Sequence, residues 1–199
     1  PGHIPPYILG LLLGDGSLGN RKVGLTVSDD DDAIITEWQM FARRNALHLR
    51  ADRKPGANCQ TYWATHGERG LSNPITDTLR VLGLAETSCG DKFIPHAYLY
   101  SDLGERWHLF AGLMDSDGSL QGGVFDYVSK SPRLADDVST LAWGLGLRVT
   151  RSEKWIKGVA YQRLCISGDL EKTPSRLARK KPQARQQKKD PTQNGFLLE

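Results

Sequence analysis

One apolar segment with a polar ending occurs twice in this chain, and it limits the folds that the chain can adopt. The first copy runs from Ile8 to Leu18 and reads ILGLLLGDGSL, and the second runs from Phe110 to Leu120 and reads FAGLMDSDGSL. Each copy is an apolar helical run that ends in Asp-Gly-Ser-Leu. A glycine directly after the last helical turn predicts a left-handed C-cap. The pattern therefore predicts two equivalent helices, each with an aspartate at its C-terminal end.

Small residues recur at helical spacing in both copies. Gly10 and Gly14 lie four residues apart in the first copy, and Gly112 and Ser116 take the matching positions in the second. Small residues at this spacing form a flat stripe on which two helices can approach closely. Either copy alone could be only a buried helix with a glycine stop, but two copies in register favour packing of the helices against each other about a two-fold axis.

This packing would place Asp15 and Asp117 side by side. The two carboxylates would repel each other, and each would lie at the negative end of a helix dipole. A divalent cation offsets both effects, because it takes oxygen ligands from carboxylates and from the free carbonyls of a helix end. The candidate metal ligands are therefore Asp15 and Asp117 together with Gly14 and Ser116. Mg2+ is the expected ion, with Mn2+ as the alternative, because ligand sets made only of oxygen exclude a typical zinc site.

The two copies also resemble a known motif. Phe110 to Gly118 closely resembles the LAGLIDADG (dodecapeptide, DOD-type) signature of homing endonucleases, and Ile8 to Gly16 resembles its degenerate first copy. The flanking residues Ile4 to Gly10 and Lys92 to Pro95 are similar to two-motif endonuclease domains found inside inteins. The resemblance implies an α+β fold: a pseudo-two-fold duplicated LAGLIDADG homing-endonuclease fold, with two antiparallel β saddles and paired central motif helices.

The resemblance also implies an activity. In that family the eighth motif position is the catalytic, metal-binding aspartate, which is Asp15 in one copy and Asp117 in the other. One aspartate from each lobe would let a single chain, a monomer, cut both strands of a long asymmetric double-stranded DNA target by metal-dependent phosphodiester hydrolysis. The sixth motif position is Asp115 in the second copy but Leu13 in the first, and this departure lies away from the catalytic position. Such domains are normally fused within an intein splicing domain, and splicing by this chain alone is not expected.

The rest of the chain repeats one order of elements. The first lobe has predicted strands at 21–28, 47–53 and 60–65, with helices that start near 29 and 73 and a short helix that ends at 99. The second lobe has a predicted strand at 124–128, a helix from 131 to 145 and a hairpin at 147–155 and 159–167. We therefore predict a first lobe at 1–100, a second lobe at 101–175 and a basic C-terminal tail at 176–199.

An acidic run, Asp29 to Asp32, precedes the first of these lobe helices. Acidic residues suit the positive N-terminal end of a helix. The run could instead bind a metal, but four consecutive aspartates cannot all point at one ion. The pattern favours helix capping.

A lysine closes each lobe in a similar local sequence. The first lobe ends with Asp91-Lys92-Phe93-Ile94-Pro95, and the second ends with Glu171-Lys172-Thr173-Pro174. Similar intein endonucleases carry a basic residue near each active centre, so Lys92 and Lys172 are our candidate catalytic lysines. A lysine there could polarise the attacking water or neutralise charge on the phosphate. Lys154 and Lys157 compete with Lys172, and either candidate could be only a surface lysine ahead of a proline turn.

Basic residues on the predicted strands are candidates for reading DNA. A sheet can enter the major groove and contact base edges through Arg, Lys, Gln, Asn and Thr. The candidate DNA-binding residues on strands are Arg21, Lys22, Arg50, Arg53, Arg148, Arg151, Lys154 and Arg163, with Gln60, Tyr62 and Gln162 as weaker additions. A run of eight basic and no acidic residues between 172 and 189 is either a solvated tail or a phosphate-binding arm. Within it, we assign Arg179, Lys180 and Lys181 to DNA binding.

Composition excludes several other classes. With 39% apolar and 25% charged residues and no long apolar run, the chain has the composition of an ordinary globular protein without a membrane span. Three widely spaced cysteines argue against a disulfide framework or a CxxC zinc site and favour a reducing, intracellular location where host DNA lies. Five scattered histidines form no ligand pattern. Signatures of H-N-H, GIY-YIG and PD-ExK nucleases are not found, and the spacing around Asp115 does not fit an EF-hand.

The alternative function comes from another class. A catalytically inactive LAGLIDADG protein that binds DNA or RNA, such as a degenerate endonuclease, a maturase or a regulator, could share this scaffold. The presence of both Asp15 and Asp117 disfavours it, because a pure binder does not need paired carboxylates beside a phosphate backbone.

Overall fold

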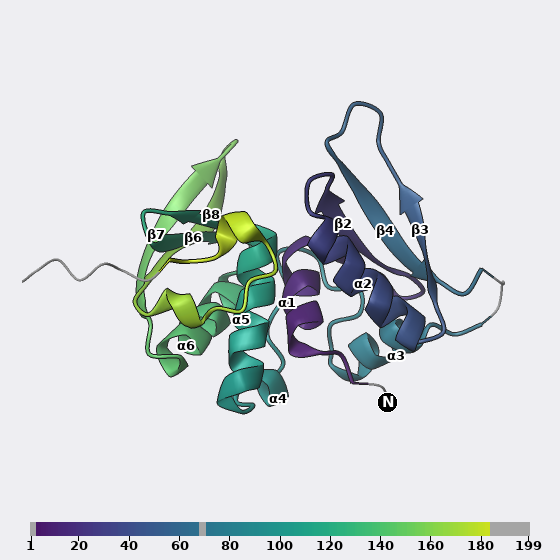
Figure 1. Cartoon of the computed structure of the whole chain (residues 1–199), viewed down its shortest axis with the longest axis horizontal. Helices are drawn as coiled ribbons and strands as arrows, with labels where there is room; N and C mark the ends of the chain where they lie inside the picture. Colours follow the sequence, from purple (N-terminus) through teal and green to yellow (C-terminus); the bar gives the residue numbers. More distant parts are fainter. Residues whose placement is uncertain (1–2, 68–70, 184–199) are drawn as a thin grey trace, which may run out of the picture.

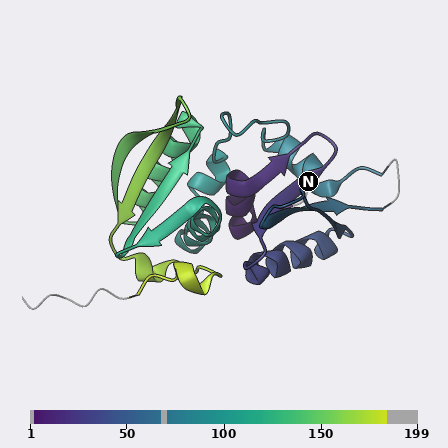
Figure 2. The same ribbon diagram turned by 90° about the horizontal axis from the view of Figure 1, so that it is seen from above.

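The computed structural model describes residues 3–67 and 71–183, and its two halves repeat the same order of elements (Figure 1). Helices α1 (Pro6–Asp15) and α5 (Leu103–Asp117) lie side by side at the centre of the molecule. A four-stranded antiparallel sheet stands on each outer side of this pair (Figures 1 and 2). The predicted α+β fold with paired central helices and two antiparallel sheets is confirmed.

The first lobe contains one sheet and three further helices. Its sheet has the order β1-β2-β4-β3, formed by β1 (Gly16–Leu18), β2 (Val23–Ser28), β3 (His48–Asp52) and β4 (Cys59–Thr65). Its other helices are α2 (Asp32–Arg44), α3 (Pro74–Val81) and α4 (His96–Leu99).

The second lobe repeats this arrangement with the order β5-β6-β8-β7. Its strands are β5 (Gly118–Gln121), β6 (Val124–Ser129), β7 (Arg148–Ile156) and β8 (Val159–Ser167), with α6 (Pro132–Gly144) between β6 and β7. Two short 3-10 turns, η1 (Leu170–Lys172) and η2 (Ala178–Lys180), follow the sheet. Strands β1 and β5 were not predicted, because three or four residues are too few to show an alternating pattern.

The two motif helices pack with almost no space between their backbones. A Cβ atom on Gly112 would lie 2.1 Å from the carbonyl oxygen of Tyr7, and one on Gly10 would lie 2.5 Å from the carbonyl oxygen of Leu109. A Cβ atom on Gly14 would lie 2.1 Å from the hydroxyl oxygen of Ser116. These distances are far below van der Waals contact, so the predicted stripe of small residues is confirmed as the surface where the two helices meet.

The prediction of left-handed C-caps at the ends of these helices is wrong. Gly16 and Gly118 have φ values of −80° and −78° and extended backbones, because each motif helix leads straight into a strand. Glycine is needed there for space. A Cβ atom would lie 2.3 Å from the carbonyl oxygen of Leu12 in the first copy, and 2.7 Å from that of Met114 in the second.

Each sheet has one face toward the helices and one face away from them. Alternate residues of β2, including Val23 and Leu25, are buried on the helix-facing side, as are Phe125 and Tyr127 of β6. We call the opposite side of each sheet the outer face. Trp38 of α2 is fully buried and donates its indole N–H to the carbonyl oxygen of Tyr62 at 2.9 Å, which fixes α2 against the first sheet.

The acidic run lies at the start of α2, as predicted, but two of its carboxylates pair with arginines rather than cap the helix. Asp31 takes the N-cap position of α2, but its side chain makes no capping hydrogen bond. It instead accepts from Arg179 at 2.9 Å, while Asp29 pairs with Arg53 at 2.5 Å. An available cation is a stronger partner for a carboxylate than a neutral backbone N–H. Within residues 3–67 and 71–183, no helix is both long and apolar enough to cross a membrane.

Candidate active site at the paired motif helices

The two motif aspartates are the last residues of α1 and α5. A Cβ atom on Gly14 would lie 3.2 Å from a carboxylate oxygen of Asp117, so the Asp117 side chain reaches the end of the other motif helix, beside Asp15. Both side chains are accessible to solvent, but protein atoms of both lobes surround them closely. The structure therefore places one carboxylate from each lobe in a single site that solvent can reach.

Lys92 reaches the end of the first motif helix. Its ammonium group donates to the carbonyl oxygens of Leu12 at 3.0 Å, Gly14 at 2.8 Å and Gly16 at 2.9 Å. The residue is only 4% exposed. An ammonium group has three N–H donors, so all of them are used at the C-terminal end of α1, where the helix dipole favours positive charge.

Lys180 does the same at the end of the second motif helix. Its ammonium group donates to the carbonyl oxygens of Met114 at 3.0 Å, Asp115 at 2.7 Å and Ser116 at 3.1 Å. This lysine is 8% exposed, so it is not available on the surface as the DNA contact that we predicted. It is instead the structural counterpart of Lys92.

Lys172 was our candidate for this position, but the structure places Lys180 at the end of the second motif helix instead. Lys172 is exposed at the end of η1. After it, Thr173, Ser175 and Leu177 are buried in turn, so the chain runs further along the protein before it turns in at Lys180. The similar sequences at the two lobe endings were therefore a coincidence. Lys180 lies eight residues after Lys172, and nothing in the sequence around it indicates that it reaches the helix end. Lys154 and Lys157, the competing candidates, are both exposed on the β7–β8 hairpin.

The four charged groups change one another's proton affinity. The protein atoms packed around Asp117 partly exclude water from its carboxylate, which, together with the negative charge of Asp15, raises the pKa of Asp117 to about 7, and Lys92 and Lys180 oppose this rise. Burial also raises the pKa of Asp15, again opposed by both lysines. Burial lowers the pKa of Lys92 and of Lys180, and the neighbouring guanidinium of Arg179 lowers that of Lys180 further.

The donor set fits a divalent cation that prefers oxygen. The carbonyl oxygens of Gly14 and Ser116 lie at the helix ends as expected, and each accepts one N–H from a lysine. A carbonyl oxygen has two lone pairs, so one remains on each. In the described part of the chain, no cluster of three or more His, Cys, Asp or Glu side chains is arranged to hold a metal, so any ion here depends on carbonyl or water oxygens besides the two aspartates.

Asp115, at the sixth motif position, joins the lobes. Its side chain is 1% exposed and accepts hydrogen bonds from the hydroxyl of Tyr7 at 2.8 Å, the backbone N–H of Arg176 at 2.7 Å and the hydroxyl of Ser175. At the matching position of the first copy, Leu13 is fully buried among apolar residues. Asp115 is therefore a structural connection between α1, α5 and the C-terminal segment.

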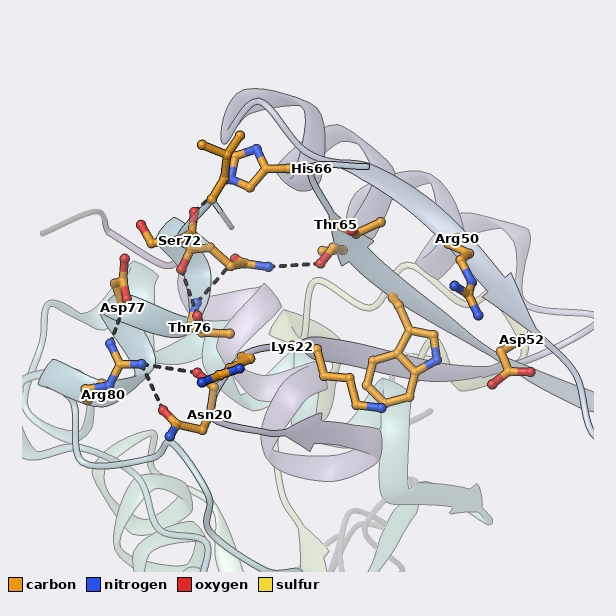
Figure 3. Close-up of a pocket in the computed structure, with 15 residues that line it drawn as sticks. Asn20, Lys22, Arg50, Asp52, Thr65, His66, Ser72, Thr76, Asp77 and Arg80 are labelled. Atoms are coloured by element: carbon orange, nitrogen blue, oxygen red, sulfur yellow. Dashed lines mark hydrogen bonds and ion pairs between the residues drawn. The ribbon is translucent and has the colours of Figure 1, made fainter. Parts of the chain in front are cut away.

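Three predicted DNA-binding residues line a cavity of about 720 Å3 on the first lobe (Figure 3). These are Arg21, Lys22 and Arg50. The ammonium group of Lys22 lies 4.3 Å from the ring centre of Trp63, which belongs to the outer face because its neighbours Tyr62 and Ala64 pack on the helix-facing side. The aromatic ring was not among the predicted contacts, and Cys165 takes the matching position in the second sheet.

The remaining predicted DNA-binding residues divide into two groups. Arg148 and Lys154 alternate with the core-facing Val149, so they lie on the outer face of the second sheet, and Arg163 lies there too in a bidentate pair with Asp126 at 2.8 and 3.0 Å. The other group is engaged elsewhere or directed away from the outer face. Its members are Arg151, which pairs with Asp136 of α6, Arg53, which pairs with Asp29, Arg179, which pairs with Asp31, and Tyr62, which packs on the core.

The predicted basic tail lies only partly within the described residues. Lys181 is exposed, whereas Arg185, Lys188 and Lys189 lie outside the described ranges. The predicted boundary at 176 falls inside a packed segment, because Leu177 and Lys180 are both buried.

The chain is similar to several known proteins. Residues 106–173 match the family model of the LAGLIDADG-like domain. The replicative DNA helicase DnaB of Mycobacterium intracellulare is 30% identical over 156 residues, which is 78% of this chain but 21% of that protein. The chain thus spans about a fifth of the length of this relative.

Solved structures share the fold. The homing endonuclease I-DmoI, in a study of its mesophilic variants, aligns with a TM-score of 0.57 and 16% identity over 82% of this chain and 87% of its own. I-DmoI in complex with DNA and Mn aligns with a TM-score of 0.58 and 18% identity over 82% and 88%. Full-length DUF199/WhiA from Thermatoga maritima aligns with a TM-score of 0.55 and 10% identity over 85% and 53%. Residues 106–173 thus match the LAGLIDADG-like domain family, and the described chain has the duplicated LAGLIDADG fold of these solved structures.

Proposed function

We propose that this chain is a site-specific DNA endonuclease that makes a double-strand cut with the help of Mg2+ or Mn2+. The observation that carries the proposal is the two-fold arrangement of Asp15 with Lys92 and of Asp117 with Lys180 at the paired helix ends. One acid and one buried ammonium from each lobe supply two matched centres, as two strands of opposite direction require.

The roles of the residues follow from their contacts. A bound divalent cation would supply a Lewis acid for the phosphate and a more acidic water. Asp15 and Asp117, with the carbonyls of Gly14 and Ser116, would hold it. Each lysine uses all three of its donors on backbone carbonyls, so its ammonium group acts by charge. It lowers the negative potential at the site, which favours both the ionised aspartates and the negative phosphate.

The outer faces of the two sheets suit an asymmetric duplex target. Where the first lobe has Gly24 opposite Trp63, the matching pair in the second lobe is Asp126 opposite Cys165. Arg50 beside Trp63 corresponds to Thr150 beside Cys165. Two halves with such different side chains would contact different base sequences, because base edges are distinguished by hydrogen bonds and apolar contacts.

The relative that is called a DNA helicase suggests the wider context. The matched region is 21% of that protein, so a segment like this chain accounts for a minor part of it. We propose that this chain forms an intein-type insertion within a larger host protein, and that it acts as a monomer inside the cell on the host's DNA. Both motif helices belong to one chain and pack against each other, so the active site does not need a second copy.

The proposal is tested with duplexes that carry the DnaB gene sequence of Mycobacterium intracellulare with the segment matching this chain removed, together with a library of randomised 30-base-pair duplexes. The purified chain is incubated with each substrate in Mg2+, Mn2+ or EDTA, and the products are sequenced. We expect metal-dependent cuts on both strands within one site. Selective binding to a duplex without cutting in either metal would support the alternative, a DNA-binding LAGLIDADG protein without catalytic activity.

A further inference from the structure

The segments that carry Lys92 and Lys180 are each attached to a helix of the opposite lobe. We define the first strap as residues 91–95, at the end of the first lobe, and the second strap as residues 174–181, after the sheet of the second lobe. Lys92 contacts α1 of its own lobe, and Lys180 contacts α5 of its own lobe. Further polar contacts of each strap cross to the other lobe.

The first strap is attached to α6 of the second lobe. The hydroxyl of Ser131 donates to the carbonyl oxygen of Lys92 at 2.7 Å, and the backbone N–H of Ile94 donates to the carboxylate of Asp137 at 2.8 Å. Ser131 is the N-cap of α6 and Asp137 is the sixth residue after it. These contacts fix the backbone at the carbonyl group of the lysine and two residues after it.

The second strap is attached to α2 of the first lobe. Arg179 pairs with Asp31 at 2.9 Å, and Arg176 pairs with Glu37 at 3.0 Å. Asp31 is the N-cap of α2 and Glu37 is the sixth residue after it. The two attachments therefore use the same two positions of matching 13-residue helices.

We infer that each active-site lysine is positioned by the opposite lobe, through Asp31 and Glu37 for Lys180 and through Ser131 and Asp137 for Lys92. Asp31, Glu37, Ser131 and Asp137 are thus positioning residues, and the placement of each ammonium group depends on the two lobes being held together. The part of this inference that concerns cleavage rests on the proposed function.

The contacts exceed those of an incidental surface ion pair. Asp31 is 7% exposed, so loss of Arg179 leaves a buried carboxylate without its partner, which is costly. Arg179 precedes Lys180 directly, and Asp115 holds the same strap through Ser175 and the backbone of Arg176. A displaced arginine therefore moves the backbone that carries the lysine.

The two attachments differ in chemistry. The second strap crosses to α2 through two ion pairs between side chains, whereas the first strap crosses to α6 through bonds that involve its own backbone groups. Partly exposed ion pairs weaken in salt, and backbone hydrogen bonds do so much less. We therefore expect the position of Lys180 to be sensitive to salt and to single charge substitutions, and the position of Lys92 to be insensitive to salt.

The first test needs neither DNA nor metal. The folded chain is pulsed with acetic anhydride, and the modification of each lysine is quantified by peptide mass spectrometry. We expect Lys180 to react at least threefold faster in Arg179→Gln and Asp31→Asn than in the wild type, with Lys92 unchanged. In Asp137→Asn, Lys92 should react at least threefold faster and Lys180 should be unchanged. Asp30→Asn and Asp136→Asn, which remove the same charge from neighbouring exposed positions, should change neither lysine, and thermal melts establish that each variant is folded.

Rescue separates positioning from general loosening. Asp31→Arg combined with Arg179→Asp restores a pair of opposite charge, and it should return the reactivity of Lys180 toward the wild-type rate. If both lysines react faster together in every strap variant, or if Lys180 stays protected in Arg179→Gln, the inference is overturned.

The second test uses cleavage of a target duplex labelled on both strands. Lys180→Met identifies the strand that depends on Lys180. Asp31→Asn should slow that same strand by about tenfold relative to the other, and Asp137→Asn should slow the other strand. Equal slowing of both strands would contradict positioning by the opposite lobe. A wild-type chain that cuts no DNA would overturn the proposed function alone, because the labelling result stands independently.

Discussion

The ammonium group of Lys180 lies against the carbonyl end of α5 as the ammonium group of Lys92 lies against the carbonyl end of α1. The two lysines are 88 positions apart and follow unrelated local sequences, yet each donates to three backbone carbonyl oxygens at the end of a motif helix, beside a motif aspartate. The relationship extends the duplication of the motif helices to a second pair of residues, and it defines two matched centres that each contain an acid and an ammonium group.

Lys180 and Lys172 should differ sharply in their effect on cleavage. Lys180→Met removes a buried positive charge next to Asp117, so we expect the cleavage rate to fall by about 100-fold, the size of effect seen when one preorganised electrostatic group is lost. Lys172→Met changes an exposed side chain and should leave the rate within about twofold of the wild type. Single-turnover cleavage at saturating enzyme measures both rates. Equal losses of cleavage rate in the two variants would show that Lys172 contributes to cleavage as much as Lys180 does.

Close packing of the motif helices should make Gly112 intolerant of any side chain. In Gly112→Ala the new methyl group would meet the carbonyl oxygen of Tyr7 at 2.1 Å, so the helices must separate. We expect the free energy of unfolding to fall by about 1–3 kcal/mol, as for other overpacked cores. Gly104→Ala is the matched control on the same helix, because its Cβ would make an ordinary 3.4 Å contact. It should raise stability by up to about 1 kcal/mol. Urea unfolding followed by circular dichroism measures both, and similar losses in the two variants would contradict the packing account.

Asp117 should make the stability of the metal-free chain depend on pH. Its pKa rises from 3.8 to about 7 on folding, so the folded state binds this proton more tightly than the unfolded state. The resulting stabilisation is fully present below pH 4 and is lost as the pH rises to 7. In Asp117→Asn the side chain at this position has no ionisable group. We therefore expect the stability of the wild type, measured in EDTA relative to this variant, to decrease between pH 4 and 7.

Mg2+ provides the control for this pH effect. At pH 8 the ionised pair of aspartates should bind the cation, so Mg2+ should raise the melting temperature of the wild type more than that of Asp117→Asn. A stability difference that is flat between pH 4 and 7 would show that Asp117 has an ordinary pKa and that the carboxylates do not interact.

Arg50 and Arg151 should separate the two faces of the sheets. Arg50 lines the cavity on the outer face, whereas Arg151 pairs with Asp136 on the helix-facing side. We expect Arg50→Ala to weaken DNA binding and to reduce the slope of log affinity against log salt concentration by about one. Arg151→Ala should leave that slope unchanged. Both slopes can be measured by fluorescence anisotropy with a labelled target at about 50 to 300 mM salt, the range over which such binding changes. A larger effect of Arg151→Ala than of Arg50→Ala would mean that DNA binds elsewhere.

Much of the architecture could be predicted because it is recorded in local patterns. The motif helices follow from an apolar run interrupted by small residues at a spacing of four, and the β7–β8 hairpin follows from alternation and a glycine turn. The short strands β1 and β5 could not be predicted, because their hydrogen bonds depend on β2 and β6 rather than on their own composition. The left-handed caps were wrong for a related reason. The sequence Asp-Gly does not distinguish a glycine that needs a positive φ from one that needs space beside Leu12 or Met114.

The candidate site was predictable only where a local sequence pattern marks its residues. Asp15 and Asp117 were found because each lies inside a repeated segment. Lys92 was found through its flanking residues, and Lys180 was missed because only the three-dimensional path of the second strap brings it to the end of α5. Arg151 was assigned to DNA binding because a basic residue on a strand gives no sign of which face it occupies until the register is known.

Strand-resolved cleavage by Asp15→Asn and Asp117→Asn tests the central claim most directly. Each variant is compared with the wild type on a duplex with a different label on each strand, in Mg2+ and in EDTA. If one carboxylate from each lobe serves a shared, metal-dependent double-strand cut, the wild type will cut both strands only with the metal, and neither variant will produce the double-strand product. Double-strand cutting that persists in either variant, or that continues in EDTA, would contradict the account.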